Sequence, residues 1–318
     1  MRVAVSGGAG FIGSHLVDAL TARGDEVLII DDLSSGVRTN LPSACRFQQE
    51  DIRSGLTLAL LREWRPDAIC HLAAQMSVSR SVREPLFDAS VNIIGSLNML
   101  EAAREMGSRF IFSSTGGALY GNANILPTAE DHPTWPLSPY GVSKLSFEHY
   151  LHCYQSEHDL SYAALRYANV YGPRQNPHGE AGVVAIFCRA MLAGQAPVIH
   201  GSGTHTRDYV YVSDVVNANL AALDSMEIGH FNVGSGRQTT VNELFSLLSH
   251  RLGVTVAATH GPERRGEQVT SALDSSLIGR RLGWKANVDL EQGLSLTVDW
   301  FRSRAGGEGQ PPLPQTSA

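Results

Sequence analysis

The chain has 318 residues, of which 43% are hydrophobic and 18% are charged, and its formal net charge at pH 7 is −6. This composition predicts a soluble globular protein with a substantial core, either two domains or one large α/β domain with an appendage. The acidic balance excludes the basic surface that nucleic-acid binding requires. No apolar run approaches membrane-spanning length, so we expect no membrane partner.

Cysteine usage indicates a reducing compartment. Cys45, Cys70, Cys153 and Cys188 show neither metal-ligand spacing nor the density of a disulfide framework. We therefore expect four reduced thiols, no metal site and a cytoplasmic protein. The chain begins directly with an apolar strand, so we also expect no signal peptide.

Strands and helices alternate in the first half of the chain. A strand at Arg2–Ser6 leads through glycines into an amphipathic helix at Gly13–Arg23, which ends at Gly24. Ser138 and Pro139 are the N-cap and first-turn residues of a helix that should end near residue 158. Further strands are predicted at 26–31, 46–49, 68–72, 109–113 and 161–166, and further helices at 56–64 and 85–106.

Repeated strand–helix units imply a Rossmann-type, doubly wound parallel α/β sheet with helices on both faces. After about residue 171 the pattern loosens. We expect a loop at 173–182, helices at 183–193 and 241–252, and a strand at 209–212. The predicted domains are a nucleotide-binding domain over 1–170 that 208–240 rejoins, a smaller interleaved α/β lobe over 171–302, and a disordered tail over 303–318.

The stretch VAVSGGAGFIGSHL places Gly7, Gly10 and Gly13 between a strand and a helix. Glycines let the backbone approach a pyrophosphate, and the helix N-terminus supplies N–H groups and the positive end of its dipole. The next strand ends in Asp31, 18 residues after Gly13, where a carboxylate can bind an adenosine ribose. Asp31 and Asp32 would repel a 2′-phosphate, which favours NAD over NADP. The alternative is a glycine turn that binds no ligand. The strand, the helix and the acid at the expected spacing argue against it.

In SPYGVSK, Tyr140 and Lys144 are four residues apart and share one face of a helix. The ordinary pKa of tyrosine, about 10, is too high for a base at neutral pH. A nearby ammonium group and a positively charged nicotinamide would lower the pKa of Tyr140. An isolated pair of this kind is more often a surface Tyr with a solvated Lys, so the interpretation depends on the rest of the chain.

Residues 1–302 resemble the extended short-chain dehydrogenase/reductases, and among them the NAD-dependent sugar-nucleotide epimerases and dehydratases. The matching motifs are GGAGFIG, Asp31, HLAA, SST, YGVSK and LRYANVYGP. The resemblance implies that Thr115 hydrogen-bonds the reacting hydroxyl, that Tyr140 moves its proton, and that Lys144 holds the nicotinamide ribose. The implied cofactor-binding residues are Gly7, Gly10, Phe11, Ile12, Gly13, Asp31, Asp32, Ser35, Asp51, Ile52, Leu72, Ala73, Ala74, Gln75, Asn92, Ser113, Tyr140, Lys144 and Tyr167.

One departure concerns the HLAA motif: better-known epimerases of the family carry a Lys near the position of Met76, so cofactor contacts there are open. For the substrate, the resemblance implies that Arg207 binds the diphosphate and that Glu267 binds a ribose. It makes Ser271 a gatekeeper facing the 2-substituent of the sugar. The implied substrate-binding residues are Thr115, Asn169, Gly182, Val183, Val184, Phe187, Arg207, Arg264, Glu267 and Ser271.

The residues after Thr115 bear on the reaction. Dehydratases of the family carry an Asp-Glu pair there and decarboxylases a Glu, whereas this chain has Gly116, Gly117, Ala118 and Leu119. Elimination would lack its second acid–base group. The resemblance therefore implies a UDP-hexose 4-epimerase that removes hydride from C4, lets the 4-keto sugar rotate and returns the hydride. The small Ser271 should admit UDP-GlcNAc and UDP-GalNAc beside UDP-glucose and UDP-galactose.

Alternatives remain open from the sequence. A UDP-glucuronate 4-epimerase or a 4-ketoreductase would carry the same motifs, and a non-catalytic NAD(H)-binding regulator could use the same fold. Helices 85–106 and 140–158 carry apolar stripes that relatives pair in a four-helix interface, which implies a homodimer. Both stripes could instead pack only on the sheet.

Overall fold

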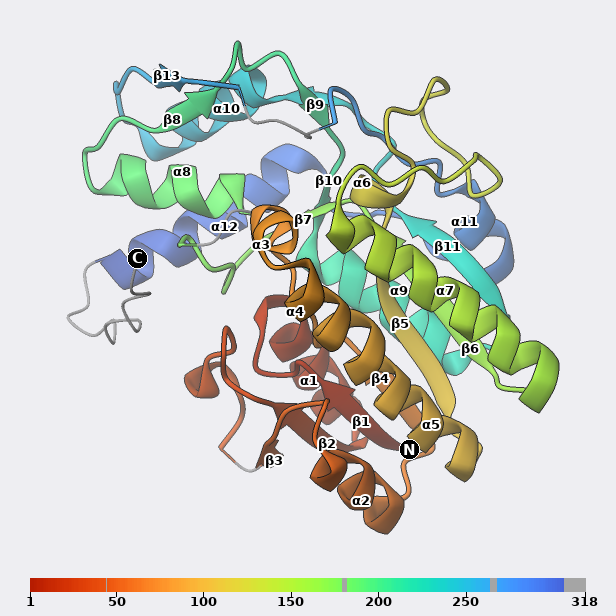
Figure 1. The fold of residues 1–318 in the computed structure, drawn as a ribbon. Coiled ribbons are helices and arrows are strands. Elements are labelled where there is room, and N and C mark those ends of the chain that lie inside the picture. The colour runs from red at the N-terminus through yellow and green to blue at the C-terminus, as the bar shows by residue number, and fades with distance from the viewer. Residues whose placement is uncertain (44, 179–181, 264–267, 306–318) are drawn as a thin grey trace.

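The computed structural model describes residues 1–43, 45–178, 182–263 and 268–305. Figure 1 shows a parallel sheet with helices on both faces, and a smaller lobe above the carboxyl ends of its strands. The predicted substrate residues Arg264 and Glu267 lie outside the described residues, as does the predicted tail over 303–318 from residue 306 onward. Residues 303–305 are not a disordered tail but the last residues of a helix.

The main sheet has seven parallel strands in the order β11-β6-β5-β4-β1-β2-β3. The order reverses beside β1, and in open sheets of this type ligands bind at such a switch point. The predicted fold class is confirmed. The strands are β1 (Arg2–Ser6), β2 (Glu26–Asp31), β3 (Arg46–Gln49), β4 (Ala68–His71), β5 (Arg109–Thr115), β6 (Tyr162–Tyr167) and β11 (Gly229–Val233).

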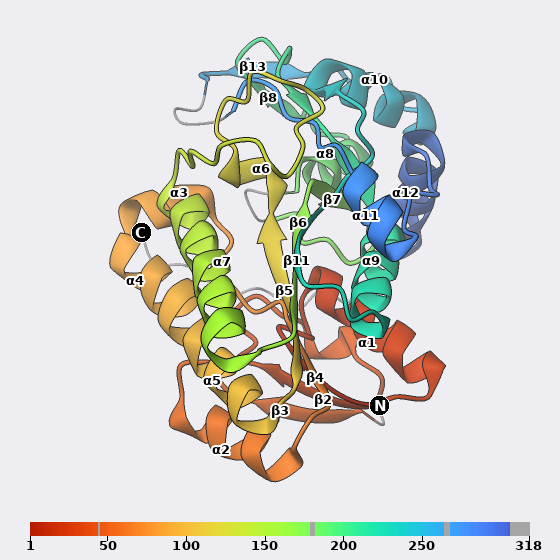
Figure 2. The ribbon, with the colours of Figure 1, turned by 90° about the vertical axis from the view of Figure 1, so that its right-hand side faces the viewer.

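Successive strand residues enter opposite cores, because side chains alternate across a sheet. Val3 and Val5 join the core under one helical layer, while Ala4 joins the other. The first layer consists of α1 (Phe11–Arg23), α9 (Val212–Asp224) and α11 (Ser276–Leu282); the second of α2 (Gly55–Trp64), α5 (Ser96–Met106) and α7 (Pro139–His158). Figure 2 shows the sheet between these layers.

The helix expected over 85–106 is confirmed in its bounds, but it is not uniform: it consists of α4 (Pro85–Ala89), the π-helical turn η2 (Ser90–Gly95) and α5. A short helix that was not predicted, α3 (Val78–Arg83), precedes it. A β-carbon at Gly95 would lie 2.8 Å from the Ile52 side chain, so only glycine lets the helix approach the end of β3 so closely. A π turn inserts an extra residue and re-aims its side chains, which periodicity does not reveal.

The smaller lobe is built from two-stranded sheets around its own apolar core. Its predicted helices at 183–193 and 241–252 and its predicted strand at 209–212, here β10, are confirmed, whereas the other strands of the three pairs and the C-terminal helix were not predicted. The sheet pairs are β7 (Asn169–Tyr171) with β10 (Tyr209–Tyr211), β8 (Val198–His200) with β13 (Thr259–Gly261), and β9 (Thr206–Arg207) with β12 (Thr239–Thr240). The helices are α8 (Val183–Leu192), α10 (Val241–Leu252) and α12 (Leu290–Ala305); the short elements η1 (Arg38–Asn40) and α6 (Gly116–Leu119) lie outside this lobe.

The interleaving of the two parts is visible in the chain order. The polypeptide enters the smaller lobe after β6, returns to the sheet through α9 and β11, and then enters the lobe again at β12. Among the residues that the structure describes, no helix is long and apolar enough to cross a membrane.

Candidate active site

Close backbone contacts require the glycines of the first turn. Gly7 has φ +69° and donates its N–H to the Ile30 carbonyl at 2.8 Å. A β-carbon at Gly7 would lie 2.6 Å from the Ala73 nitrogen, and one at Gly13 would lie 2.1 Å from the Gly7 oxygen. Gly10 is the N-cap of α1 and no side chain caps this helix. Its first N–H groups are therefore left for an anion, which fits a pyrophosphate.

Asp31 holds this turn against the second strand. Its side chain is buried; Oδ2 accepts a hydrogen bond from the Ala9 N–H and Oδ1 one from the Leu33 N–H, both at 2.9 Å. Burial raises the pKa of Asp31, and these two N–H groups oppose the rise. Each carboxylate oxygen keeps a further lone pair for a ribose hydroxyl. Asp32 and Ser35 are exposed beside it, as an adenosine site requires.

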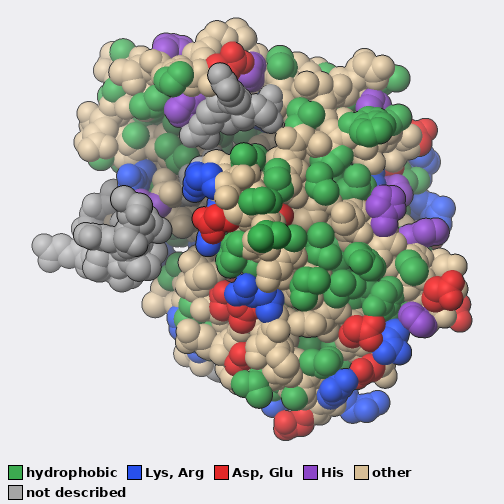
Figure 3. Space-filling model, viewed as in Figure 1, with side chains coloured by type: hydrophobic (Ala, Val, Ile, Leu, Met, Phe, Trp, Pro, Cys, Tyr) green, Lys and Arg blue, Asp and Glu red, His purple; other side chains and the backbone are tan. Residues whose placement is uncertain are grey.

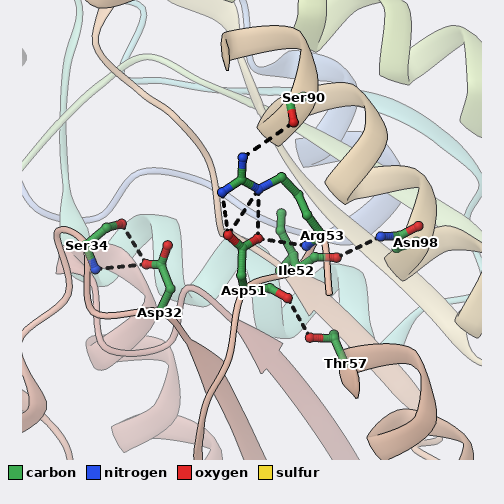
Figure 4. Close-up of polar contacts among 8 residues, drawn as sticks. All are labelled: Asp32, Ser34, Asp51, Ile52, Arg53, Thr57, Ser90 and Asn98. Atoms are coloured by element: carbon green, nitrogen blue, oxygen red, sulfur yellow. Dashed lines mark hydrogen bonds and ion pairs between the residues drawn. The ribbon is translucent and has the colours of Figure 1, made fainter. Parts of the chain in front are cut away.

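The turn after β3 is braced by an arginine that sequence analysis missed (Figure 4). Arg53 donates from Nε and Nη2 to the Asp51 carboxylate, and from Nη1 to Ser90 on η2 at 3.4 Å. The Ile52 carbonyl accepts from Asn98 at 3.1 Å. Charge-assisted bonds from Arg53 hold the pKa of Asp51 below its usual range. The predicted cofactor-binding residues Asp51 and Ile52 thus sit on a braced turn.

The loop after β4 is fixed by Asn92. Its Oδ1 accepts the Gln75 N–H at 2.8 Å and its Nδ2 donates to the Gln75 carbonyl at 2.9 Å. Leu72, Ala73 and Ala74 before it are half-buried. Met76 is 54% exposed, so the polar contacts of this loop come from Gln75, whose position is adjacent to the one where relatives carry Lys.

Thr115, Tyr140 and Lys144 converge where β5 ends beside the first two turns of α7. A hydrogen bond joins Tyr140 to Thr115. Lys144 Nζ donates to the Ser113 carbonyl at 2.9 Å, and its side chain is buried. Burial lowers the pKa of Lys144 to about 8. Burial also raises the pKa of Tyr140 to about 12, helped by the Asp88 carboxylate, so the expected lowering by Lys144 does not prevail in the protein alone.

Gly116 and Gly117 follow Thr115 but meet different surroundings. A β-carbon at Gly116 would lie 2.4 Å from Leu273 Cδ1, so this glycine is needed for packing. One at Gly117 would meet only Asn169 Oδ1 at 3.7 Å and Thr115 Oγ1 at 3.9 Å. A side chain at 117 would therefore lie between the catalytic threonine and the predicted diphosphate residue.

The predicted substrate contacts of the smaller lobe are only partly brought to this cleft. Val184 and Phe187 are each 1% exposed and pack in the lobe core, so their side chains do not reach it. Gly182 is buried at the N-cap of α8, and Val183 is half-buried. Arg207 is half-buried on β9, and Ser271 is 5% exposed, directly before the residues that back Gly116.

One further position, Tyr167, behaves differently from expectation. The Tyr167 hydroxyl hydrogen-bonds Asn219 of α9, at 3.0 Å to Oδ1 and 2.8 Å to Nδ2, and the ring is 5% exposed. This predicted cofactor contact therefore faces the core under α9. It also hydrogen-bonds the Ser113 side chain, so it braces the strand that presents the catalytic residues.

A buried ionic network behind the site was not predicted. Glu148, four residues after Lys144, forms a bidentate ion pair with Arg166 of β6 and accepts the Ser114 hydroxyl at 2.5 Å. Arg166 also donates to Tyr120, whose hydroxyl donates to Asn232. The signal was present in the i, i+4 spacing from Lys144, which places Glu148 on the same buried face of α7.

A second buried carboxylate anchors the segment beside Ser271. Asp208 accepts hydrogen bonds from the N–H groups of Ser235, Gly236 and Leu273 and from the Ser235 hydroxyl, at 2.6–3.1 Å. Burial raises the pKa of Asp208, and these donors oppose the rise. The Leu273 side chain that excludes any substituent at Gly116 is thereby held in place.

An open glycine turn at the switch point of a doubly wound sheet, with Thr, Tyr and Lys at the adjoining strand end, defines a dinucleotide-dependent enzyme that moves a proton and a hydride together. Residues 3–234 match the family model described as the NAD dependent epimerase/dehydratase family. The chain belongs to this family.

Solved structures show the same fold throughout. A crystal structure of UDP-glucose 4-epimerase with UDP-glucose from Thermotoga maritima is 49% identical, covering 95% of this chain and 99% of that one, with a TM-score of 0.94. A Thermus thermophilus UDP-glucose 4-epimerase in complex with NAD is 43% identical, covering 96% and 100%, with a TM-score of 0.92. A UDP-N-acetylglucosamine 4-epimerase from Methanobrevibacter ruminantium, in complex with UDP-N-acetylmuramic acid, is 37% identical, covering 95% and 98%, with a TM-score of 0.90.

Proposed function

We propose that this chain is an NAD-dependent UDP-hexose 4-epimerase acting on UDP-glucose and UDP-galactose. The relatives of known activity share 43–49% of its residues over nearly the whole length. The observation that carries the proposal is the stretch after Thr115: residues 116–119 include no acid or base, and a β-carbon at Gly117 would meet only Asn169 and Thr115 among the described residues. Elimination of water would require a second acid or base.

Each residue of the site has a separate role in the proposed reaction. Bound NAD supplies a reversible hydride acceptor, and its positive charge favours the Tyr140 phenolate despite the raised pKa of this residue. Thr115 orients the C4 hydroxyl, and Tyr140 takes its proton as hydride leaves C4, giving a 4-keto sugar. Return of hydride and proton to the opposite face inverts C4. Lys144, fixed on the Ser113 carbonyl, stabilises the phenolate.

A panel of UDP-sugars tests this function. Purified protein should interconvert UDP-glucose and UDP-galactose without added reductant, because the hydride that is removed is the one returned. Turnover of UDP-glucuronate alone would favour the corresponding 4-epimerase, and net consumption of NADH would indicate a 4-ketoreductase. Bound NAD with no turnover of any UDP-sugar would favour a regulator, although Thr115, Tyr140 and Lys144 are all present, with Tyr140 hydrogen-bonded to Thr115 and Lys144 to the Ser113 carbonyl.

The proposal extends to N-acetylhexosamines through Ser271. The small hydroxyl leaves space for an acetamido group, so UDP-GlcNAc and UDP-GalNAc should be turned over as well. Ser271→Tyr should fill this space and abolish turnover of the N-acetyl pair while sparing UDP-glucose. Full activity of the variant on UDP-GlcNAc would show that residue 271 does not face the sugar.

We also propose that the chain is a cytoplasmic homodimer. All four cysteines are free, as a reducing compartment requires. Figure 3 shows hydrophobic side chains gathered over α4 and α7, where a groove of about 460 Å³ separates the two helices. Leu137 and Val142 line this groove, and Leu86, Ile94 and Trp135 are neighbours in sequence of other lining residues; all five are 49–86% exposed. Exposed apolar side chains gathered in this way favour an interface with another chain.

The oligomeric state can be tested by a substitution that introduces one charge into the groove region. Leu86→Arg should convert the dimer into a monomer in light-scattering chromatography, because the arginine would be buried in the interface. Leu56→Arg is the matched control, since Leu56 is 67% exposed on α2, away from this groove. A monomeric parent chain would refute the dimer.

A further inference from the structure

Asp88 is a carboxylate whose role neither the predicted motifs nor the mechanism explains. It lies on α4 with 1% of its surface exposed. Its Oδ1 accepts two hydrogen bonds, from Gln75 Nε2 at 2.8 Å and from Asn92 Nδ2 at 3.0 Å. Burying a charged group is costly unless the surrounding donors and charges compensate it, so its presence requires a reason.

The two amides that Asp88 binds support the loop after β4: Gln75 lies in this loop and Asn92 lies on η2. Asn92 holds both backbone groups of Gln75, and the Gln75 side chain holds both sides of the next turn, donating to the Ser77 carbonyl at 2.9 Å and accepting its N–H at 2.7 Å. A single oxygen of Asp88 thereby fixes the rotamers of both amides. The π turn η2 places Asn92 for this contact.

The same cluster reaches the catalytic helix. Asn92 Nδ2 lies 3.3 Å from Ser143 Oγ, and this hydroxyl donates to the Tyr140 carbonyl at 2.9 Å. The chain of bonds therefore runs from the loop after β4 to the turn of α7 that carries Tyr140. Two of these residues, Asp88 and Ser143, also form part of the wall of the groove between α4 and α7.

We propose that Asp88 is a positioning residue for the Tyr140–Lys144 pair: it fixes Gln75 and Asn92, and through them the loop after β4 and the turn of α7 that carries Tyr140. Only the expected changes in kcat and its pH profile rest on the proposed function.

Among the described residues, Asp88, Glu148 and His71 are titratable groups around Tyr140 and Lys144. Asp88 raises the pKa of Lys144 against the effect of burial, and it raises that of Tyr140. Glu148 acts on Lys144 in the same direction but is neutralised by Arg166. His71, held between the hydroxyls of Ser6 and Ser96, has its pKa lowered to about 3 by burial and by Lys144, so it stays neutral in any assay.

Asp88→Asn removes the charge and weakens, without abolishing, the hydrogen bonds from Gln75 and Asn92, because a neutral amide oxygen accepts more weakly than a carboxylate. Loss of the carboxylate should lower the pKa of both Tyr140 and Lys144, so both limbs of the kcat–pH profile should move to lower pH. We expect kcat to fall about 10- to 100-fold, the scale on which small misplacements act, with KM for UDP-glucose nearly unchanged. Glu84→Gln, which removes an exposed charge at the start of α4, is the matched control.

Gln75→Leu complements this variant: it removes a donor to Asp88 but no charge, so it should lower kcat without shifting the pH profile. The affinity of each cofactor-free protein for NAD, measured by titration calorimetry, provides a readout besides turnover. It should weaken in both variants, because the loop after β4 loses its support, and stay unchanged in Glu84→Gln. The NAD affinity also tests the role of Asp88 when the parent chain turns over no UDP-hexose. That absence of turnover would refute the proposed function but not the role of Asp88.

Two results would overturn the inference. One is an Asp88→Asn protein with the kcat, pH profile and NAD affinity of Glu84→Gln. The other is a protein in which only the unfolding temperature changes, which would make Asp88 a purely structural residue. If Asp88→Asn does not fold, Gln75→Leu with unchanged kcat and NAD affinity would have the same meaning.

Discussion

Replacing Gly116 and Gly117 separately by alanine should affect two different properties of the protein. At Gly116 the new methyl group would lie within 3.1 Å of three Leu273 side-chain atoms. Leu273 is 1% exposed and its N–H is bonded to Asp208, so it cannot move away. Overpacking of this kind costs about 1–3 kcal/mol. The higher helix propensity of alanine offsets at most about 1 kcal/mol of this.

Gly117→Ala meets no such obstacle, because its nearest neighbours would lie at 3.7 and 3.9 Å. The variant should be as stable as the parent or up to about 1 kcal/mol more stable, from helix propensity alone. Its methyl group would occupy the space between Thr115 and Asn169. An added methyl in a binding pocket typically costs about 10-fold or more in kcat/KM.

Thermal unfolding and epimerase kinetics of both variants measure the two effects. We expect the unfolding temperature of Gly116→Ala to fall below that of Gly117→Ala by several degrees, on the scale of about 2 °C per kcal/mol for a chain of this size. Only Gly117→Ala should lose most of its kcat/KM while keeping its stability. Equal stability of the two variants would refute the rigidity of Leu273, and full activity of Gly117→Ala would show that the sugar does not use this space.

Three further substitutions test the catalytic residues and their support. Tyr140→Phe keeps the ring but removes the proton carrier, so kcat should fall by about 10²–10⁴ while UDP-glucose still binds; unchanged turnover would exclude Tyr140 as the base. Burial lowers the pKa of Lys144 from 10.5 to about 8, so the folded chain binds fewer protons between these values than the unfolded chain, and the unfolding free energy should rise with pH in this window. Lys144→Met should lose this rise in urea unfolding of the cofactor-free protein, and equal slopes for the two proteins would contradict the shift. Glu148→Ala leaves Arg166 charged and buried, so it should cost about 3–5 kcal/mol in urea unfolding, and a loss below 1 kcal/mol would mean that water reaches the pair.

The sequence was sufficient to predict the parallel sheet and the glycine turn between β1 and α1. The glycines of the first turn, an acid at a strand end and a Tyr–Lys spacing are local sequence patterns. They can be recognised without knowing which strands lie side by side. The fold therefore followed from the alternation of apolar strands and amphipathic helices in the first half of the chain.

The parts that escaped prediction depend on contacts between distant residues. The role of Asp88 requires Gln75, Asn92 and the π turn, and helix periodicity alone predicted an uninterrupted helix there. The burial of Phe187 follows from the core of the smaller lobe, whose strands are only two or three residues long and leave no periodic signal. Likewise, the different surroundings of Gly116 and Gly117 are set by Leu273, more than 150 residues away in the sequence.

The position of β11 in the main sheet has a consequence for engineering. This strand pairs with β6, yet it lies between two segments of the smaller lobe in the chain. Neither part can be excised as a continuous fragment, so the smaller lobe cannot be exchanged between relatives by a single crossover. We expect chimeras to succeed only when the segments on both sides of β11 are replaced together, and the two parts to melt in one cooperative transition.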